Sequence, residues 1–201
     1  SSSAASDVYK RQGYLAFWVN QEIMDEVGIE SIDTKEDFMN YMKAASGNGR
    51  YGYGGSWEKT YVSNELAQFV NMFGGDYFDW TNPANKEAVQ FMHDLVAEGY
   101  TPIDQIADKY EQMNPKANDG KYGSLFMWGL GTDYAKADML GEDKIHMAMV
   151  PDFSGTGERA IFTDSWNYVL NSASKNKEAA VKFLQYMAVS YTHLTLPTNS
   201  R

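Results

Sequence analysis

The sequence predicts an α/β fold, in which short strands alternate with amphipathic helices. Apolar residues recur at helical spacing in segments such as 62–73 and 88–96. Short apolar runs at 51–53, 122–128 and 145–150 are bounded by Gly, Asn, Asp or Pro, which is typical of buried strands. Helices and strands that alternate along a chain favour this fold class.

Helix-capping residues predict where several helices begin. Asn20 is suited to cap a short helix that stops at Gly28. Asp33 and Glu36 have the spacing of a capping box, so the next helix is predicted to begin there. Asn82-Pro83 supplies a cap and a first-turn proline for a further helix.

The second half of the chain shows a similar alternation. An Asp-Gly turn precedes the strand predicted at 122–128, and a helix is expected near 133–140. Residues 160–163 and 166–170 are expected to be extended. The last helix is predicted from its apolar stripe, which comprises Ala179, Ala180, Phe183, Leu184 and Met187.

Residues 1–12 and 189–201 are predicted not to be native. Ser2–Gln12 can be back-translated into DNA whose reverse complement, in another frame, encodes Val189–Thr198 letter for letter. That DNA resembles a transposase-based sequencing adapter. We therefore expect a chain truncated at both ends, in which a missing signal segment says nothing of the whole protein's location.

Composition excludes several functional classes. The formal net charge of −10 disfavours nucleic acid as a partner, since phosphate contacts need clustered Lys and Arg. The absence of cysteine excludes a thiol nucleophile and cysteine-based zinc sites. Aromatic residues reach 14%, with 14 Tyr and 5 Trp, and we expect most of these rings to lie in the core.

Motifs that carry catalytic chemistry are absent from the sequence. There is no G-x-S-x-G, H-E-x-x-H, P-loop or nucleotide-binding G-x-G-x-x-G pattern. His93 and His146 are expected to be structural or surface residues. We therefore expect no catalytic residue, no metal and no cofactor.

Four segments together resemble a known family in the expected order. They are FWVNQEIMDEVGIESIDTKEDFMNYMKAA (Phe17–Ala45), FVNMFGGDYF (Phe69–Phe78), NDGKYGSLFMWG (Asn118–Gly129) and the stretch Val150–Met187. The resemblance is to family 1 extracellular solute-binding proteins, the maltose-binding-like group. It covers nearly all of residues 13–188.

This resemblance implies a type II, periplasmic-binding-protein-like fold with two lobes in the whole protein. Residues 13–150 would be mostly one α/β lobe, and 151–188 would return to the other. The implied function is to bind a carbohydrate outside the cytoplasm, in the periplasm or as a cell-surface lipoprotein, and to deliver it to the permease subunits of an ABC importer. The protein would be a monomer, would not be an enzyme, and would meet the membrane only through an anchor absent here.

A sugar offers flat C–H faces and a rim of hydroxyl groups, so its site needs aromatic rings with amide and carboxylate partners. Residues at strand-to-helix turns, together with positions where the family reaches its ligand, give the predicted ligand-binding set: Trp57, Glu58, Tyr61, Asn64, Trp128, Asp164, Ser165 and Trp166. Each ring has a core position as its alternative. Tyr77, Phe78 and Trp80 are expected to pack inside the lobe.

Two other functions stay open. A glycoside-acting enzyme would also have an aromatic, acidic cleft, because its paired carboxylates are brought together only by the fold. A binding protein for a peptide or polyamine would also suit the acidic charge.

Overall fold

The computed structural model describes residues 9–129 and 144–195; the side chains of 9–12, 165–167 and 188–195 are not among those described. The chain forms two compact units. The larger unit is Tyr14–Thr163, and the smaller unit combines Ser1–Gly13 with Asp164–Arg201.

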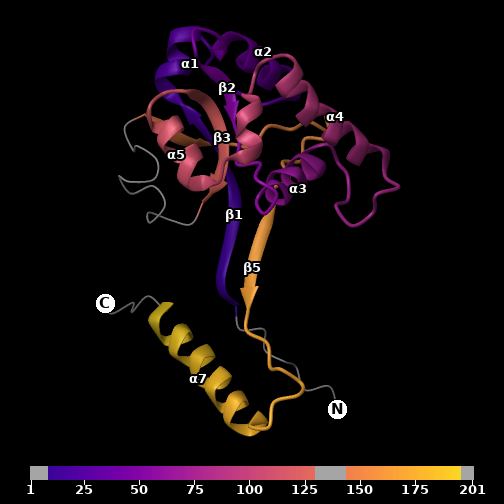
Figure 1. Cartoon of the computed structure of the whole chain (residues 1–201), viewed down its shortest axis with the longest axis vertical. Coiled ribbons are helices and arrows are strands. Elements are labelled where there is room, and N and C mark those ends of the chain that lie inside the picture. The colour runs from indigo at the N-terminus through magenta and orange to yellow at the C-terminus, as the bar shows by residue number, and fades with distance from the viewer. Residues whose placement is uncertain (1–8, 130–143, 196–201) are drawn as a thin grey trace. The chain divides into compact units, whose positions relative to one another are not determined.

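The larger unit is built on a mixed sheet (Figure 1). Strands β1 (Tyr9–Asn20), β2 (Tyr51–Gly54), β3 (Tyr122–Trp128) and β4 (Ile145–Ala148) follow the order β2-β3-β1-β4. β1 is antiparallel to β3 and β4, whereas β2 and β3 are parallel. This α/β arrangement confirms the predicted fold class.

Both faces of the sheet are buried. Leu15, Phe17 and Val19 of β1 point into one apolar core, and the alternating Ala16 and Trp18 point into another. The first core contains residues of α1 (Gln21–Val27), α2 (Lys35–Ala45), α3 (Val62–Met72) and α4 (Pro83–Ala97). The second core contains residues of α5 (Tyr110–Asn118).

Two of the predicted helix starts are confirmed. The Asn20 side chain accepts a hydrogen bond from the Ile23 N–H, and α1 ends at Gly28, whose φ is 72°. The Asn82 side chain caps α4, and Pro83 occupies its first turn. These residues satisfy N–H groups that a helix otherwise leaves without partners.

The predicted capping box at Asp33 and Glu36 is wrong by one residue. The box is formed by Thr34, whose hydroxyl accepts from the Asp37 N–H, and by the Asp37 carboxylate, which accepts from the Thr34 N–H. Asp33 instead accepts a hydrogen bond from Arg159 at 2.6 Å. Both pairs are three residues apart, so spacing alone does not tell which one forms the box. In the structure Asp33 forms an ion pair with Arg159 and Thr34 is the cap.

A short 3-10 helix, η1 (Ile103–Ala107), and helix α5 occupy a stretch for which the sequence predicts no element. Their signal is weak, because α5 contains Pro115 and buries only Met113, Asn114 and Ala117. The helix predicted near 133–140 lies outside the described residues.

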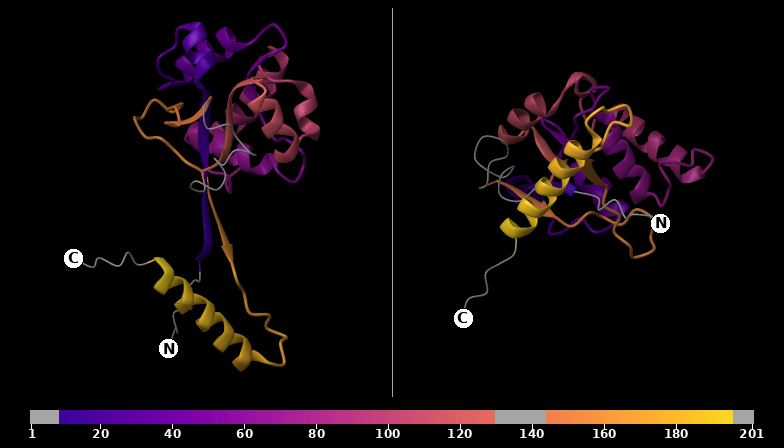
Figure 2. Two further views of the ribbon diagram at one scale, coloured as in Figure 1. Left: turned by 90° about the vertical axis from the view of Figure 1, so that its left-hand side faces the viewer. Right: turned by 90° about the horizontal axis from the view of Figure 1, so that it is seen from below.

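The smaller unit contains α7 (Lys177–Thr195) and most of β5 (Thr163–Asn167), which pairs with β1. α7 is continuous in every view (Figure 2). It extends beyond the predicted stripe, and Phe183 and Tyr186 on it are exposed. Among the described helices, none combines the length and apolar character needed to cross a membrane.

The boundary between the units follows Thr163. The lobe boundary expected after Val150 stays a prediction. Residues 151–163 remain with the larger unit because they bind it at several points. The Asp152 N–H donates to the Asp33 carbonyl at 2.8 Å, and the ring of Phe153 lies 5.3 Å from that of Phe38 in the first core.

Candidate functional site

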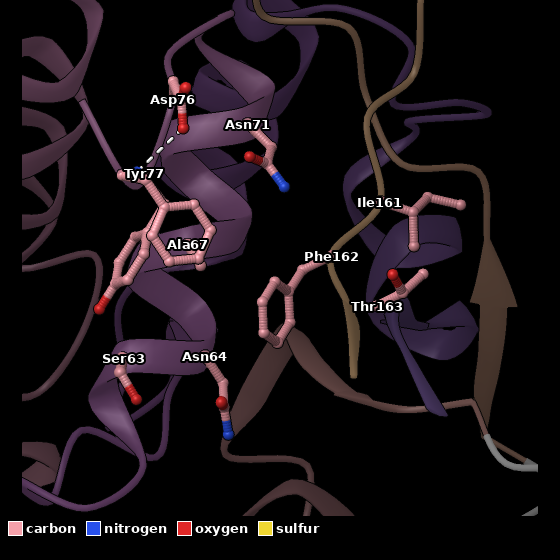
Figure 3. Close-up of a pocket in the computed structure, with 10 residues that line it drawn as sticks. Ser63, Asn64, Ala67, Asn71, Asp76, Tyr77, Ile161, Phe162 and Thr163 are labelled. Carbon is pink, nitrogen blue, oxygen red and sulfur yellow. Dashed lines mark hydrogen bonds between the residues drawn. The ribbon is translucent and has the colours of Figure 1, made fainter. Parts of the chain in front are cut away.

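The larger unit contains an open pocket of about 440 Å³ between α3 and residues 161–163 (Figure 3). We call it the α3 pocket. Its lining comes from α3, from the loop that follows α3, and from the segment leading into β5: Ser63, Asn64, Ala67, Asn71, Asp76, Tyr77, Phe78, Ile161, Phe162 and Thr163.

Helix α3 forms one wall because Ser63, Ala67 and Asn71 recur at i, i+4 and i+8 and so share one face. Asn64 lies beside this stripe. On the opposite face Phe69 and Met72 are buried in the first core, which fixes the rotation of the helix.

Gln68 of α3 forms hydrogen bonds with the backbone of the segment that makes the opposite wall of the pocket. Its side-chain amide donates to the Ala160 carbonyl at 2.8 Å, and its carbonyl oxygen accepts from the Phe162 N–H at 2.6 Å. The Leu15 N–H donates to the Phe162 carbonyl at 2.9 Å. The backbone on both sides of Phe162 is therefore fixed, and its ring is held in the pocket.

The chemistry of the lining is mixed. Asn64 and Asn71 bring amides, Asp76 brings a carboxylate, and Tyr77 and Phe162 bring aromatic rings. Small-molecule sites characteristically combine apolar and aromatic surface with a few polar groups that fix orientation. This set offers hydrogen-bond donors, acceptors and ring faces to a neutral ligand with many hydroxyl groups.

Tyr110 of α5 links three of the predicted site residues. Its hydroxyl accepts hydrogen bonds from Trp128 Nε1 at 3.1 Å and from Asn64 Nδ2 at 3.3 Å. Its ring packs edge-on against Tyr61, with centroids 4.8 Å apart. Trp128 also lies 6.2 Å from the Phe162 ring. Burial raises the pKa of Tyr110 to about 12, so its hydroxyl is neutral at neutral pH.

Trp57 lies elsewhere. Its side chain is 8% exposed, and its indole N–H donates to Glu65 Oε2 at 2.8 Å. It lines a separate, mostly apolar cavity of about 480 Å³ bordered by α3, α4 and Ile103 of η1. Trp57 does not line the α3 pocket, and Trp128 does not line this second cavity. That both border one ligand cleft stays a prediction.

Glu65, on the buried side of α3, accepts hydrogen bonds from the Tyr53 hydroxyl, the Ser56 N–H and the Trp57 indole. Burial raises its pKa to about 7, against the lowering effect of these donors. The carboxyl group fixes the turn between β2 and α3, and this turn leads to Tyr61.

Glu58 and residues 164–166 complete the predicted set, and they belong to different units of the chain. Glu58 is partly exposed, and hydrogen bonds from Thr60 lower its pKa. Asp164 belongs to the smaller unit, as do Ser165 and Trp166, whose strand backbone is described but whose side chains lie outside the described residues. Their role in binding stays a prediction.

Sequence reasoning missed several pocket residues. Asn71 was detectable, because it continues the i, i+4 pattern of Ser63 and Ala67. Phe162 carries no local signal, since tertiary contacts alone bring it to the pocket. The same holds for Tyr110, which is not part of the lining but hydrogen-bonds the pocket residue Asn64. The expectation that Phe78 and Trp80 pack inside the lobe is wrong: their side chains are 92% and 55% exposed.

An open pocket lined by amides, a carboxylate and aromatic rings has the chemistry that suits a small polar molecule. The family model for bacterial extracellular solute-binding proteins matches residues 3–189. The chain therefore belongs to the bacterial extracellular solute-binding protein family. None of the curated protein sequences matches the chain.

Solved structures show the same fold. MalE3 of T. maritima, bound to maltose, aligns with a TM-score of 0.72 at 20% identity, covering 90% of this chain and 49% of that one. A sugar transporter protein of Arthrobacter chlorophenolicus A6 with laminaribiose aligns at 0.80 and 19% identity, covering 96% and 50%. A solute-binding protein of Agrobacterium vitis S4 with D-mannitol aligns at 0.71 and 20% identity, covering 94% and 48%.

The chain spans about half the length of these solved structures. The likeness establishes the fold class, which agrees with the resemblance noted in the sequence.

Proposed function

We propose that the chain binds a carbohydrate or polyol outside the cytoplasm and that the α3 pocket forms part of its binding site. The observation that carries this proposal is the lining of the pocket, where aromatic rings stand beside amides and a carboxylate. Structurally similar proteins contain maltose, laminaribiose and mannitol, and such ligands need this combination of apolar faces and hydroxyl partners.

Within this proposal, Asn64 lines the α3 pocket and contacts the ligand directly. Tyr61 and Trp128 are not part of the lining and act through their contacts with Tyr110. Tyr110 fixes the orientation of the Asn64 amide and the Trp128 indole. Preorganised partners of this kind lower the entropy lost on binding. Trp57 acts through the turn before α3, where its indole binds Glu65.

The bound solute would be passed to the permease subunits of an ABC importer, and the protein would act as a monomer in the periplasm or on the cell surface as a lipoprotein. This part of the proposal is supported by the family to which the chain belongs, since proteins of that family bind solutes outside the cytoplasm.

Heteronuclear NMR of the 201-residue chain tests the proposal, with glucose, maltose, laminaribiose and mannitol as ligands. We expect at least one of them to shift the indole N–H signal of Trp128 and the side-chain amide signal of Asn64 in a saturable way. Spermidine and a tripeptide serve as comparison ligands for the two other binding functions. If none of the four sugars and polyols shifts these signals, the proposal is wrong.

A further inference from the structure

The loop between α3 and α4 displays an aromatic surface that begins in the α3 pocket and continues into solvent. Tyr77 and Phe78 line the pocket. The rings of Phe78 and Trp80 each lie 5.8 Å from that of Tyr77, with steep interplanar angles of 90° and 67°. Phe78 and Trp80 are largely exposed, although rings of this size are usually covered in folded proteins. We call residues 76–81 the aromatic loop.

The aromatic loop is held in a fixed conformation by one buried amide. Asn85 Nδ2 donates to the carbonyls of Asp76, at 2.7 Å, and Asp79, at 3.1 Å, while its Oδ1 accepts from the Asp76 N–H at 3.2 Å. Gly75 permits this approach, because a Cβ at that position would overlap Asn85 Oδ1. The exposed rings therefore stand on a backbone that is ordered before any ligand arrives.

Carboxylates border the rings. Asp76 Oδ1 accepts from the Phe78 N–H at 2.9 Å, and Asp79 Oδ1 accepts from the Thr81 N–H at 3.0 Å and from its hydroxyl at 2.6 Å. A carboxylate has further acceptor capacity beyond these bonds. Aromatic faces with carboxylate acceptors at their edges repeat the chemistry of the pocket itself.

We propose that the aromatic loop binds the second ring of a saccharide whose first ring lies in the α3 pocket, so that the ligand is an oligosaccharide. This inference rests on the proposed function. Two fixed rings next to a pocket give a sugar ring an apolar face at little cost in entropy. A protein partner fits less well, because stable interfaces bury about 800 Å² on each side and two rings flanked by acidic residues offer far less.

The test compares Phe78→Ala and Trp80→Ala with the wild-type chain, and measures dissociation constants for glucose, maltose and laminaribiose by NMR titration. Ile106→Ala is the matched control, since Ile106 is an exposed apolar side chain that is not part of the α3 pocket. We expect the wild-type chain to bind at least one disaccharide about tenfold more tightly than glucose, and each loop variant to lose that advantage. Glucose binding should be unchanged in the Trp80→Ala and Ile106→Ala variants, because neither residue lines the α3 pocket, and the Trp80 indole signal should shift with the disaccharide alone.

Failure of this inference is distinguishable from failure of the proposed function. If the wild-type chain binds no sugar, the proposed function is wrong and this inference is wrong with it. If glucose binds as tightly as the disaccharides, or if both loop variants keep disaccharide affinity, the aromatic loop is not a second-ring site although the pocket binds sugar. Loop variants that weaken self-association and leave sugar affinity unchanged would identify the surface as a protein contact instead.

Discussion

At the scale of single residues, the fold changes the ionisation of Glu65 in the neutral pH range. Burial raises its pKa to about 7, whereas the ordinary value is 4.5. A raised pKa means that the folded protein favours the protonated carboxyl group. The stability that this preference contributes is complete below about pH 4.5 and is lost as the pH rises through about 7.

We therefore expect the free energy of unfolding to fall, by on the order of 3 kcal/mol from Glu65 alone, between about pH 5 and about pH 8. Urea denaturation at a series of pH values measures this fall. Glu65→Gln should remove it, while Glu111→Gln, at an exposed position on α5, should retain it. A fall of unchanged size in the Glu65→Gln variant would show that another group causes it.

Tyr110 is the second residue with a role that one substitution can test. Tyr110→Phe removes the hydroxyl that accepts from Trp128 and Asn64, and leaves both donors without this partner. We expect a loss of about 1 kcal/mol in stability and weaker binding of the saccharide, because the Asn64 amide is no longer oriented. Tyr51→Phe, which removes a hydroxyl beside Tyr122 in the second core, is the control and should leave sugar affinity unchanged.

At the scale of elements, the sequence predicted the helices whose capping residues and apolar stripes are local. Asn20 and Asn82 begin α1 and α4 as expected, because a cap and its N–H partner lie within three residues of each other. Helix α5 was missed because its short buried stripe is interrupted by Pro115. The candidate site was predictable to a smaller degree, since Asn64 lies on a detectable helix but Phe162 reaches it from the far end of the unit.

Contacts between elements limit which residues they tolerate. Strand β2 passes so close to α2 that a Cβ on Gly52 would lie 2.6 Å from the Met42 Cα. Neither backbone can yield without moving a whole element. We expect Gly52→Ala to destabilise the protein by about 2 kcal/mol or more, as measured by thermal unfolding. An unchanged midpoint would mean that β2 and α2 separate easily.

The aromatic loop depends on Asn85 in a comparable way. Asn85→Ala removes three hydrogen bonds to the backbone of Asp76 and Asp79. We expect faster amide hydrogen exchange in residues 76–81 and a stability loss of about 1–3 kcal/mol. Exchange in β3 should change only through the global loss. Unaltered exchange in the loop would show that the Asn85 side chain does not hold it.

At the scale of the molecule, both apolar cores consist of residues between Leu15 and Phe153, within the larger unit. A chain comprising residues 14–163 should therefore fold alone. We expect a single cooperative urea transition followed by circular dichroism, and a sugar-dependent shift of the Trp128 indole signal if the pocket binds sugar. A gradual, non-cooperative transition would show that the smaller unit is needed for the fold.

The bonds from Gln68 to residues 160 and 162 join positions 92 and 94 apart along the chain. Closing so long a loop is entropically costly, and contacts of this range form slowly compared with the turns of a helix. On a ribosome, α3 emerges long before the segment that faces it. The pocket is consequently incomplete until residues 160 and 162 have docked on Gln68, so α3 presents one wall without the other for as long as the larger unit is only partly folded.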